Sequence, residues 1–345
     1  MQTIDMILVT GGTGLVGSHL LYSLTKKEEI VRAIYRTKRS IEKTKLVFES
    51  YNAEQQLNQI EWVEADLTDY FSLKDAFEGI SHVYHAAAMV SFDPQFSDQL
   101  IKVNVEGTEN MVNISLEHHI KKFCFVSSVS SLGEYQNGKC TDEGAAWQNT
   151  KYTTNYSISK YYAENEVWRA SQEGLPVVIV NPATILGFGD WESSSLKIIK
   201  RVYDGLPFYT PGKNGFVGVT DVVKVMVQLM EGKLVNERYV LVSENSTFKE
   251  LFEKIASTLN VKPPRKKASY FLANVLKNLD QIRAKLTGTS AVLTSESVRA
   301  AFKKKCYKAS KVQSDLNFKF EPLELTIEKA GRQFLSYKSK LAKLS

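Results

Sequence analysis

The chain has 345 residues, of which 43% are hydrophobic, and its 44 Lys and Arg against 38 Asp and Glu give a formal net charge of +6. This length fits one large α/β unit or a unit with a second lobe, and the hydrophobic content is too high for a disordered chain. No apolar run approaches the roughly 18 residues that a membrane span requires. A glycine-rich segment begins at Gly11, so we expect no signal peptide ahead of it. We therefore expect no integral membrane span.

The first half of the chain alternates short apolar runs with helical patterns, which predicts a parallel sheet with crossover helices. Each run is short and largely apolar, as expected where both faces of a sheet are covered. Strands are expected over Met6–Thr10, Ile30–Tyr35, Ile60–Glu64, His82–His85, Lys122–Ser127 and Pro176–Asn181. Helices are expected over Leu15–Thr25, Ser72–Glu78, Phe96–His118 and Tyr156–Gln172.

The pattern loosens after Asn181. Residues 187–218 are rich in Gly, Ser and Pro and predict loops with one helix near Ser195–Tyr203. A further strand near 238–242 is expected to return to the first unit, and the chain beyond Phe248 is expected to be helical. The predicted fold is a Rossmann-type doubly wound parallel sheet over residues 1–181, with a smaller, mainly helical substrate-binding lobe over 182–345. Active sites of such folds form in the cleft beyond the carboxyl ends of the strands.

The strongest motif is an apolar strand followed by glycines at three-residue spacing and then a helix, within residues 6–25. Glycine lets the backbone turn sharply and approach a pyrophosphate, and the following helix N-terminus offers N–H groups and a positive dipole end. A phosphate loop of the nucleoside triphosphatase kind is excluded because Ser18 and His19 stand where Lys and Ser/Thr would be needed. A dinucleotide cofactor is therefore expected. The residues expected to contact it here are Gly11, Thr13, Gly14, Leu15, Val16 and Gly17.

The end of the second predicted strand distinguishes NAD from NADP. A carboxylate there would accept hydrogen bonds from the ribose hydroxyls and repel a 2′-phosphate, but residues 35–39 read Tyr-Arg-Thr-Lys-Arg. Arg36 can pair with a phosphate in a bidentate fork, with Arg39 or Lys43 nearby. This favours NADP(H), with NAD(H) and a merely solvated basic loop as the alternatives.

Three other strand ends are expected to border the cofactor. Asp66 either meets the adenine ring or caps the helix that follows Thr68. His85 is expected to be a packed, hydrogen-bonded histidine next to small residues that let the cofactor lie against the backbone. The positions concerned are Asp66, Leu67, His85, Ala86, Ala87, Asn181 and Pro182.

Tyr156 and Lys160 lie four residues apart, on one face of a predicted helix. A free tyrosine titrates near pH 10, and a neighbouring lysine charge favours the phenolate and lowers that pKa. Lys160 can also reach the nicotinamide ribose. Ser128 follows the fifth predicted strand, where a hydroxyl can stabilise charge that develops on a substrate oxygen. These three residues predict an acid–base centre.

The combination of motifs resembles the extended short-chain dehydrogenase/reductase superfamily, that is, the NAD-dependent epimerase/dehydratase group. Residues 31–36, 156–164 and 180–187 carry a closer likeness to its dihydroflavonol reductase and cinnamoyl-CoA reductase branch. The resemblance implies that Ser128, Tyr156 and Lys160 form the catalytic triad, that Arg36 contacts the NADP phosphate, and that Asn104 supports a proton-relay water near the lysine. The motifs behind the resemblance cover residues 10–17, 65–68, 85–88, 104–108, 125–128, 156–160 and 219–222.

The predicted function is hydride transfer from NADPH to a carbonyl of a small organic substrate. An isomerase or lyase that keeps NAD bound, such as a sugar-nucleotide epimerase or dehydratase, is the main alternative, and a non-catalytic NADP-binding sensor is another. Aromatic residues in the second lobe favour an apolar or ring-bearing substrate, although core packing explains them equally well. They are Phe188, Trp191, Phe208, Tyr209 and Phe216.

Charge is unevenly distributed, because residues 261–345 carry 19 Lys and Arg and 6 Asp and Glu. We interpret this as a solvated lysine-rich face, with an anionic substrate or a membrane surface as alternatives. Binding to nucleic acid is not expected, since the clusters Arg265–Lys267 and Lys303–Lys305 lack interleaved aromatics. Tyr270–Leu286 has an apolar helical stripe, which we expect to pack over the substrate pocket, with peripheral membrane attachment as the alternative. A homodimer is left open.

The cysteines and histidines predict neither a disulfide nor a metal site. Cys124, Cys140 and Cys306 have no metal-ligand or disulfide-like spacing. We interpret them as reduced packing residues of a cytoplasmic protein. The five histidines are scattered along the chain.

Overall fold

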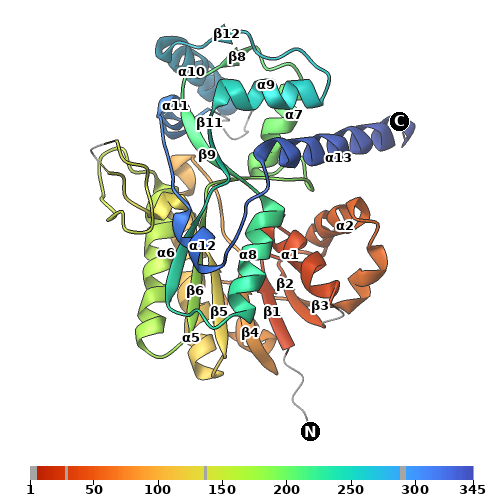
Figure 1. Ribbon diagram of the computed structural model, residues 1–345, viewed down its shortest axis with the longest axis vertical. Coiled ribbons are helices and arrows are strands. Elements are labelled where there is room, and N and C mark those ends of the chain that lie inside the picture. Colours follow the sequence, from red (N-terminus) through yellow and green to blue (C-terminus); the bar gives the residue numbers. More distant parts are fainter. Residues whose placement is uncertain (1–5, 28–29, 136–137, 288–292, 345) are drawn as a thin grey trace.

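The computed structural model describes residues 6–27, 30–135, 138–287 and 293–344. Its centre is a seven-stranded parallel sheet in the order β10-β6-β5-β4-β1-β2-β3 (Figure 1). The strand order reverses between β1 and β4, which is where a doubly wound sheet opens a crevice at the carboxyl ends of its strands. The strands are β1 (Met6–Thr10), β2 (Val31–Tyr35), β3 (Ile60–Glu64), β4 (Ile80–His85), β5 (Lys122–Val126), β6 (Val177–Pro182) and β10 (Glu237–Leu241).

Helices cover both faces of this sheet, so most of its strand residues are buried. Two separate hydrophobic clusters fill the two interfaces, one under α1 and α8 and the other under α5 and α6. The first layer contains α1 (Leu15–Thr25), α2 (Ile41–Ser50) and α8 (Val219–Glu231). The second contains α3 (Tyr70–Ala76), α4 (Ser97–Ile101), the π-helical turn η4 (Lys102–Glu106), α5 (Gly107–Glu117) and α6 (Asn155–Gln172).

The second lobe lies beyond the carboxyl ends of the strands, at the top of Figure 1, and a third hydrophobic cluster holds it together. It has a three-stranded sheet of β7 (Thr184–Leu186), β9 (Lys213–Gly218) and β11 (Glu244–Thr247), and a two-stranded one of β8 (Phe208–Tyr209) and β12 (Lys266–Lys267). Its helices are α7 (Lys197–Tyr203), α9 (Phe248–Thr258), α10 (Tyr270–Thr287), α11 (Ser295–Phe302) and α13 (Leu323–Leu344), while α12 (Ser310–Asp315) packs against β10.

The predicted fold class is confirmed, but two helices that cover the large sheet, α2 and α8, were not among the predicted elements. The helix expected over Phe96–His118 is interrupted by η4. The strand expected near 238–242 is β10, which pairs with β6 at the edge of the large sheet. The small strands of the second lobe were not predicted, because strands of two to six residues carry too little periodicity to be recognised. One of them, β12, falls where the chain was expected to be helical. Phe188, Trp191 and Phe216 are buried in the third cluster, which favours the core interpretation for them.

The interpretation of all three cysteines as reduced is wrong for Cys140 and Cys306, which form a disulfide across 166 residues of sequence. The backbone of Thr141 donates to Cys306 O at 2.8 Å and accepts from Lys308 N at 2.9 Å, so the two segments are paired as well as cross-linked. Tertiary folding brings them together, and sequence spacing carries no signal of it. Cys124 is a buried free thiol. The argument from reduced cysteines to a cytoplasmic location therefore loses its support.

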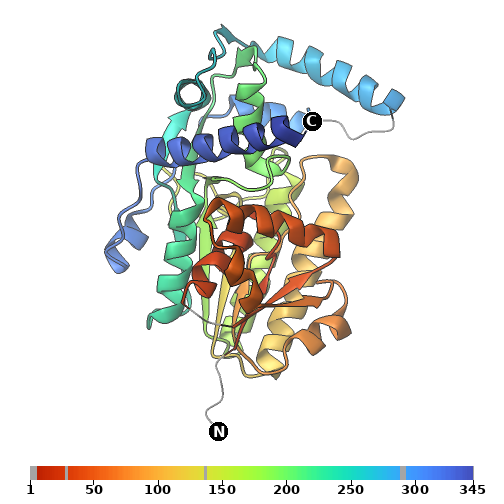
Figure 2. The same cartoon turned by 90° about the vertical axis from the view of Figure 1, so that its right-hand side faces the viewer.

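The expectation that the apolar stripe of α10 packs over the substrate pocket is also wrong. Most of its large apolar side chains are exposed, and Ala284 is the buried residue of the helix. Figure 2 shows α10 projecting from the top of the molecule, clear of the central sheet. Within the described ranges, no helix is long and apolar enough to cross a membrane.

Candidate active site

The glycine turn after β1 packs so closely against its own backbone and the end of β4 that two of its glycines leave no room for a side chain. Gly11 has φ of +70°, and a Cβ on it would lie 2.6 Å from the backbone nitrogen of Ala87 at the end of β4. A Cβ on Gly17 would lie 2.1 Å from Gly11 O. Helix α1 begins after Gly14, which offers no side chain to cap it. The positive end of the helix is therefore available to an anion.

Arg36 is exposed directly after β2, and its charge acts on the carboxylate of Asp66 after β3. Arg39 is exposed in the following turn, whereas Lys43 forms a salt bridge with Asp190 at 2.8 Å. Arg36 and Arg39 are thus exposed cations at this edge of the sheet, as is Lys38 between them.

Asp66 does not cap the following helix, contrary to one of the two interpretations of it. Its Oδ1 accepts from the backbone N–H and from the hydroxyl of Thr68, both at 2.8 Å. The N-cap of α3 is Asp69, whose side chain accepts from Phe71 N and Ser72 N. Partial burial favours the neutral acid, but the Thr68 hydrogen bonds and the charge of Arg36 outweigh it and lower the pKa of Asp66.

The other predicted cofactor contacts lie at the same edge of the sheet, and several of them pack inward. Leu67 belongs to the second hydrophobic cluster, and Val16 belongs to the first. Ala87 N donates to Thr10 Oγ1 at 3.2 Å. Pro182 ends β6 and lies beside Leu241 of β10. Thr13 and Leu15 are half-buried, as is Ala86.

Ser128 and Tyr156 meet although 28 residues separate them in the sequence. Ser128 follows β5, and Tyr156 lies in the first turn of α6, which Thr154 caps through its side chain. Burial raises the pKa of Tyr156, and a hydrogen bond with the Ser128 side chain opposes that rise. The net direction is upward, opposite to the fall expected from Lys160, because burial of the phenol outweighs the hydrogen bond to its charged form.

Lys160 lies one turn further along α6 and is buried. Its Nζ donates to Val126 O at 2.8 Å and lies 4.3 Å from the centre of the Phe125 ring. Burial lowers the pKa of Lys160 to about 7, and the nearby carboxylate of Glu164 partly opposes this. A lysine that titrates near neutrality can exchange a proton at physiological pH.

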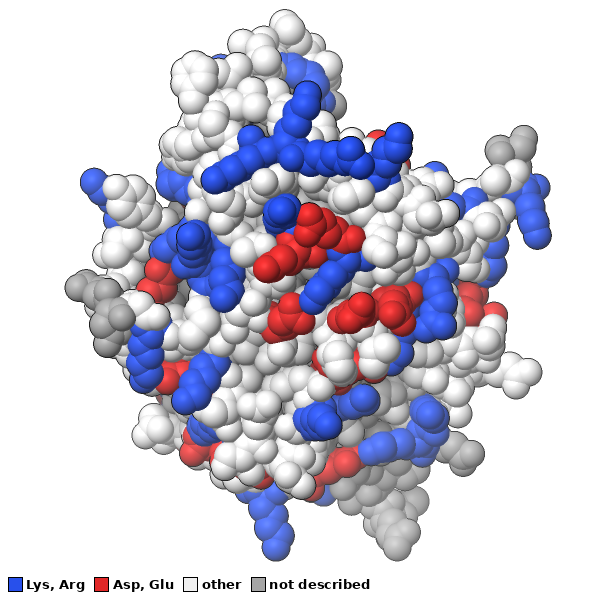
Figure 3. Space-filling view, turned by 45° about the horizontal axis from the view of Figure 1, so that its top comes forward, with Lys and Arg blue, Asp and Glu red and all other residues white. Residues whose placement is uncertain are grey.

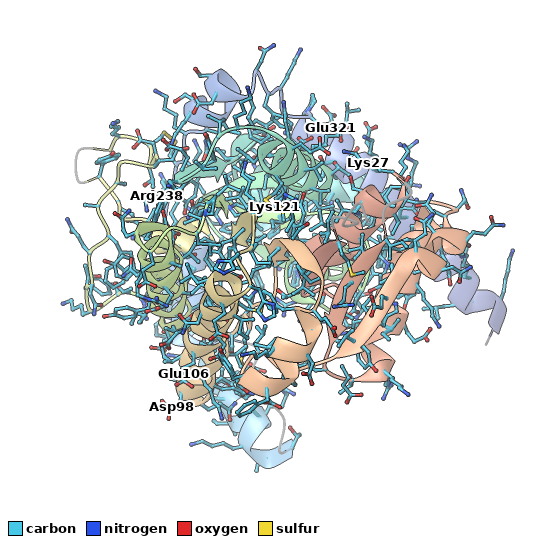
Figure 4. All side chains as sticks on the ribbon, turned by 90° about the horizontal axis from the view of Figure 1, so that it is seen from below. Lys27, Asp98, Glu106, Lys121, Arg238 and Glu321 are labelled. Atoms are coloured by element: carbon cyan, nitrogen blue, oxygen red, sulfur yellow. A yellow bond between two sulfur atoms is a disulfide. The ribbon has the colours of Figure 1, made fainter. Side chains whose placement is uncertain are left out.

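Asn104 is buried within the π-helical turn η4, a feature found often at functional sites. Its Oδ1 accepts from Met89 N at 2.7 Å, and its Nδ2 donates to Met89 O at 2.9 Å and to Ser159 Oγ at 3.0 Å. Asn104 therefore ties the segment after β4 to the residue that precedes Lys160. Asp98 and Glu106, by contrast, point outward from this part of the chain (Figure 4).

His85 is packed and hydrogen-bonded, as expected. Its Nδ1 lies 2.6 Å from Thr10 Oγ1 and its Nε2 lies 3.0 Å from Thr108 Oγ1. Burial, and to a lesser extent the charge of Lys160, lowers the pKa of His85 to about 3. A neutral imidazole with both nitrogens engaged holds β1, β4 and α5 together.

Glu164 is a buried carboxylate that sequence reasoning did not single out. It accepts from Ser127 Oγ at 2.5 Å, from Ser131 Oγ at 2.7 Å and from Asn181 Nδ2 at 2.8 Å. Arg238 of β10, labelled in Figure 4, also donates to it at 3.0 Å. The carboxylate thus joins the carboxyl ends of β5 and β6 to the helix that carries Tyr156 and Lys160. Its position four residues after Lys160, on the same helix face, was the available signal.

Asn181 is buried at the end of β6, where its Nδ2 donates to Glu164 Oε2 at 2.8 Å and to Ser128 O at 3.2 Å. Its Oδ1 is buried without a hydrogen-bond partner among the described residues. No cluster of three or more His, Cys, Asp and Glu able to hold a metal ion occurs in the described ranges. Fold and site together define a dinucleotide-dependent α/β enzyme.

The chain belongs to the NAD dependent epimerase/dehydratase family, whose sequence model matches residues 7–241. It is therefore an NAD(P)-dependent enzyme of the extended short-chain dehydrogenase/reductase type. It is 29% identical over 262 residues to the sterol demethylase protein B of Methylococcus capsulatus, covering 75% of this chain and 76% of that protein. It is 26% identical over 339 residues to a putative dihydroflavonol 4-reductase of Synechocystis, covering 96% and 95%. The expected likeness to dihydroflavonol reductases is thus confirmed as a distant relationship.

Solved structures show the same fold at lower identity. The UDP-glucose 4-epimerase of Thermotoga maritima, solved with UDP-glucose, superposes with a TM-score of 0.73 at 20% identity, covering 96% of this chain and 99% of that one. At that identity the likeness shows the fold alone.

Proposed function

We propose that the protein is an NADPH-dependent reductase that acts on a carbonyl group of a small organic substrate. The observation that carries the proposal is the contact between the Ser128 hydroxyl and the Tyr156 phenol, one helical turn from the buried Lys160. These groups stand at the same sheet edge as the glycine turn after β1. The relatives named as reductases support the same chemistry.

In the proposed reaction, bound NADPH supplies a hydride to the substrate carbonyl carbon. The Tyr156 hydroxyl donates a proton to the carbonyl oxygen, since a phenol is protonated at neutral pH. The Ser128 hydroxyl donates a hydrogen bond to the same oxygen and so stabilises the charge that develops there. Lys160 orients the nicotinamide ribose and, with a pKa of about 7, can return a proton to Tyr156.

Tyr156→Phe tests this assignment, because it removes one oxygen and leaves the ring in place. We expect kcat to fall by about 10²–10⁴-fold, the range typical of a lost general acid, while NADPH affinity stays within about twofold. The measurement is NADPH absorbance over a panel of aldehydes and ketones. Tyr162→Phe is the matched control, since Tyr162 is on the same helix and 46% exposed. Full activity of Tyr156→Phe would reject the mechanism.

The preference for NADP(H) is a further part of the proposal and depends on Arg36. Titration calorimetry should show tighter binding of NADPH than of NADH, and Arg36→Glu should reverse the order because a carboxylate repels the 2′-phosphate. Lys26→Glu makes the same charge change on an exposed residue at the far end of α1 and should leave the order unchanged. Equal affinities of the unmodified protein for NADPH and NADH would contradict the proposed preference for NADP(H).

A sugar-nucleotide epimerase or dehydratase is the second candidate, favoured by the match to the NAD dependent epimerase/dehydratase family. Such an enzyme regenerates its NAD in each cycle. Protein that retains NAD through gel filtration and interconverts UDP-sugars without net change in nicotinamide absorbance would establish this candidate in place of the reductase.

A further inference from the structure

Helix α10 presents a continuous apolar strip to solvent, which we call the α10 stripe. Spacings of four, four, three and four residues keep its members within about 80° of the helix circumference. Phe271 is 79% exposed, Leu279 58%, Ile282 55% and Leu286 82%. Isolated exposed apolar residues are ordinary, but a contiguous exposed strip marks an interaction surface. The stripe consists of Phe271, Val275, Leu279, Ile282 and Leu286.

The opposite face of α10 is attached to the lobe, so the stripe is held outward. Ala284 is buried on that face, and Lys277 Nζ donates to Ser295 Oγ of α11 at 3.2 Å. Asp280 Oδ2 accepts from Leu293 N at 2.8 Å. These contacts fix the rotation of the helix about its axis. The stripe therefore cannot turn inward without breaking them.

Basic residues surround the stripe. Residues 262–286 contain seven Lys and Arg and a single acidic residue, Asp280. At roughly 3.6 residues per turn, Lys285 flanks the stripe on one side. Arg283 flanks it on the other and is paired with Asp280 at 2.8 Å. Arg265–Lys267 precede the helix. Lys and Arg side chains also gather across the upper part of the face drawn in Figure 3, with most acidic side chains below them. Long basic side chains beside an apolar strip can reach headgroup phosphates while the strip enters the acyl region.

We propose that the α10 stripe docks this enzyme onto the surface of a membrane that contains anionic lipids. The helix would lie in the plane of the headgroups, with the five apolar side chains in the acyl boundary and the basic side chains at the phosphates. Its projection beyond the rest of the lobe, seen in Figures 2 and 4, allows this contact without displacing any other element.

A second copy of the chain fits the same surface poorly. A symmetric pair through α10 would bring two strongly basic segments together, and repulsion between like charges opposes that arrangement. One helix face is also narrow beside the roughly 800 Å² per partner of a stable interface. An anionic lipid surface complements both the apolar and the charged residues.

Vesicle flotation tests the proposal with the full-length protein. The test compares phosphatidylcholine vesicles that contain phosphatidylglycerol with vesicles that contain no anionic lipid. Binding is expected to the anionic vesicles, with a strong reduction at high salt because charge contributes. Phe271→Ser combined with Leu279→Ser and Leu286→Ser should lower the bound fraction by at least about tenfold. The triple variant should keep the melting temperature and cofactor affinity, because its side chains are exposed.

The control is Phe71→Ser on α3, which removes a phenylalanine that is likewise 79% exposed but lies far from α10 in sequence. It should float like the unmodified protein. The proposal is overturned if the unmodified protein does not float with anionic vesicles, or if the triple variant floats equally well. Self-association that the triple variant abolishes, without vesicle binding, would assign the stripe to a second copy instead. None of these outcomes depends on the substrate or on the proposed reductase activity.

Discussion

The carboxyl edge of the large sheet and helix α10 both depart from the usual distribution of residue types, in opposite directions. At the sheet edge, Lys160, Glu164 and Asn104 are charged or polar and buried. On α10, Phe271 and Leu286 are apolar and exposed. Burying a charge destabilises the folded state unless the charge is paired. Exposed apolar side chains stabilise a complex when a partner covers them.

The two regions differ in whether their side chains find interaction partners within the chain. Lys160, Glu164 and Asn104 each have partners within the chain, such as Val126 O for Lys160 and three side-chain donors at Glu164 Oε2. That region is preorganised for chemistry. The apolar residues of α10 have no equivalent cover within the described part of the chain, so that region is organised for contact with something else.

The largest expected effect on stability comes from breaking the Glu164 network. Glu164→Ala leaves Arg238, Ser127 and Asn181 without their shared acceptor, and we expect the free energy of unfolding to fall by about 3–5 kcal/mol. Glu244→Ala in the second lobe is the matched control, because its salt bridge with Lys254 at 2.9 Å is partly exposed. That change should cost less than about 1 kcal/mol. Similar urea midpoints for the two variants would show that the buried Glu164 network contributes no more to stability than the partly exposed Glu244 salt bridge.

The disulfide comes next, since it joins the loop after β5 to the segment after α11. Replacing Cys140 and Cys306 by serine frees a closed loop of 166 residues, and we expect a loss of about 2–4 kcal/mol in the free energy of unfolding. Dithiothreitol should lower the melting temperature of the unmodified protein and leave that of the double variant unchanged. Alkylation of the denatured, unreduced protein should label Cys124 alone. Three labelled thiols would contradict the cross-link.

The smallest effect concerns pH and the burial of Lys160. Its pKa of about 7 in the folded protein lies below the ordinary value of 10.5, so between those values the unfolded chain binds more protons. Stability should therefore rise with pH across this window, by at most about 1.4 kcal/mol per pH unit from this group. The burial penalty is fully present below pH 7.

Lys160→Met isolates that contribution, because Glu164 and His85, the titratable neighbours of Lys160, are retained. Urea unfolding between about pH 7.5 and 9.5, below the range of ordinary tyrosine titration, should give a shallower rise for the variant. Equal slopes for the two proteins would show that Lys160 keeps its charge when folded.

Local motifs could be predicted because residues close together in the sequence are enough to form them. The turn at Gly11–Gly17 needs glycine for steric reasons, and Tyr156 and Lys160 share a helix face through their spacing alone. The bounds of β1 and β3 agree with the apolar runs at residues 6–10 and 60–64. The direction of the Tyr156 pKa was not predictable in this way, because it depends on burial by distant segments.

The amino-acid sequence by itself determined the doubly wound fold, the cofactor class and the pair of Tyr156 and Lys160, since periodicity and spacing along one chain segment express them. Only the tertiary structure decided which strand ends share the Glu164 carboxylate, which cysteines pair and which side of α10 faces water. Each of these depends on contacts between segments that are far apart in the chain. The spacing of residues along the sequence does not predict such contacts.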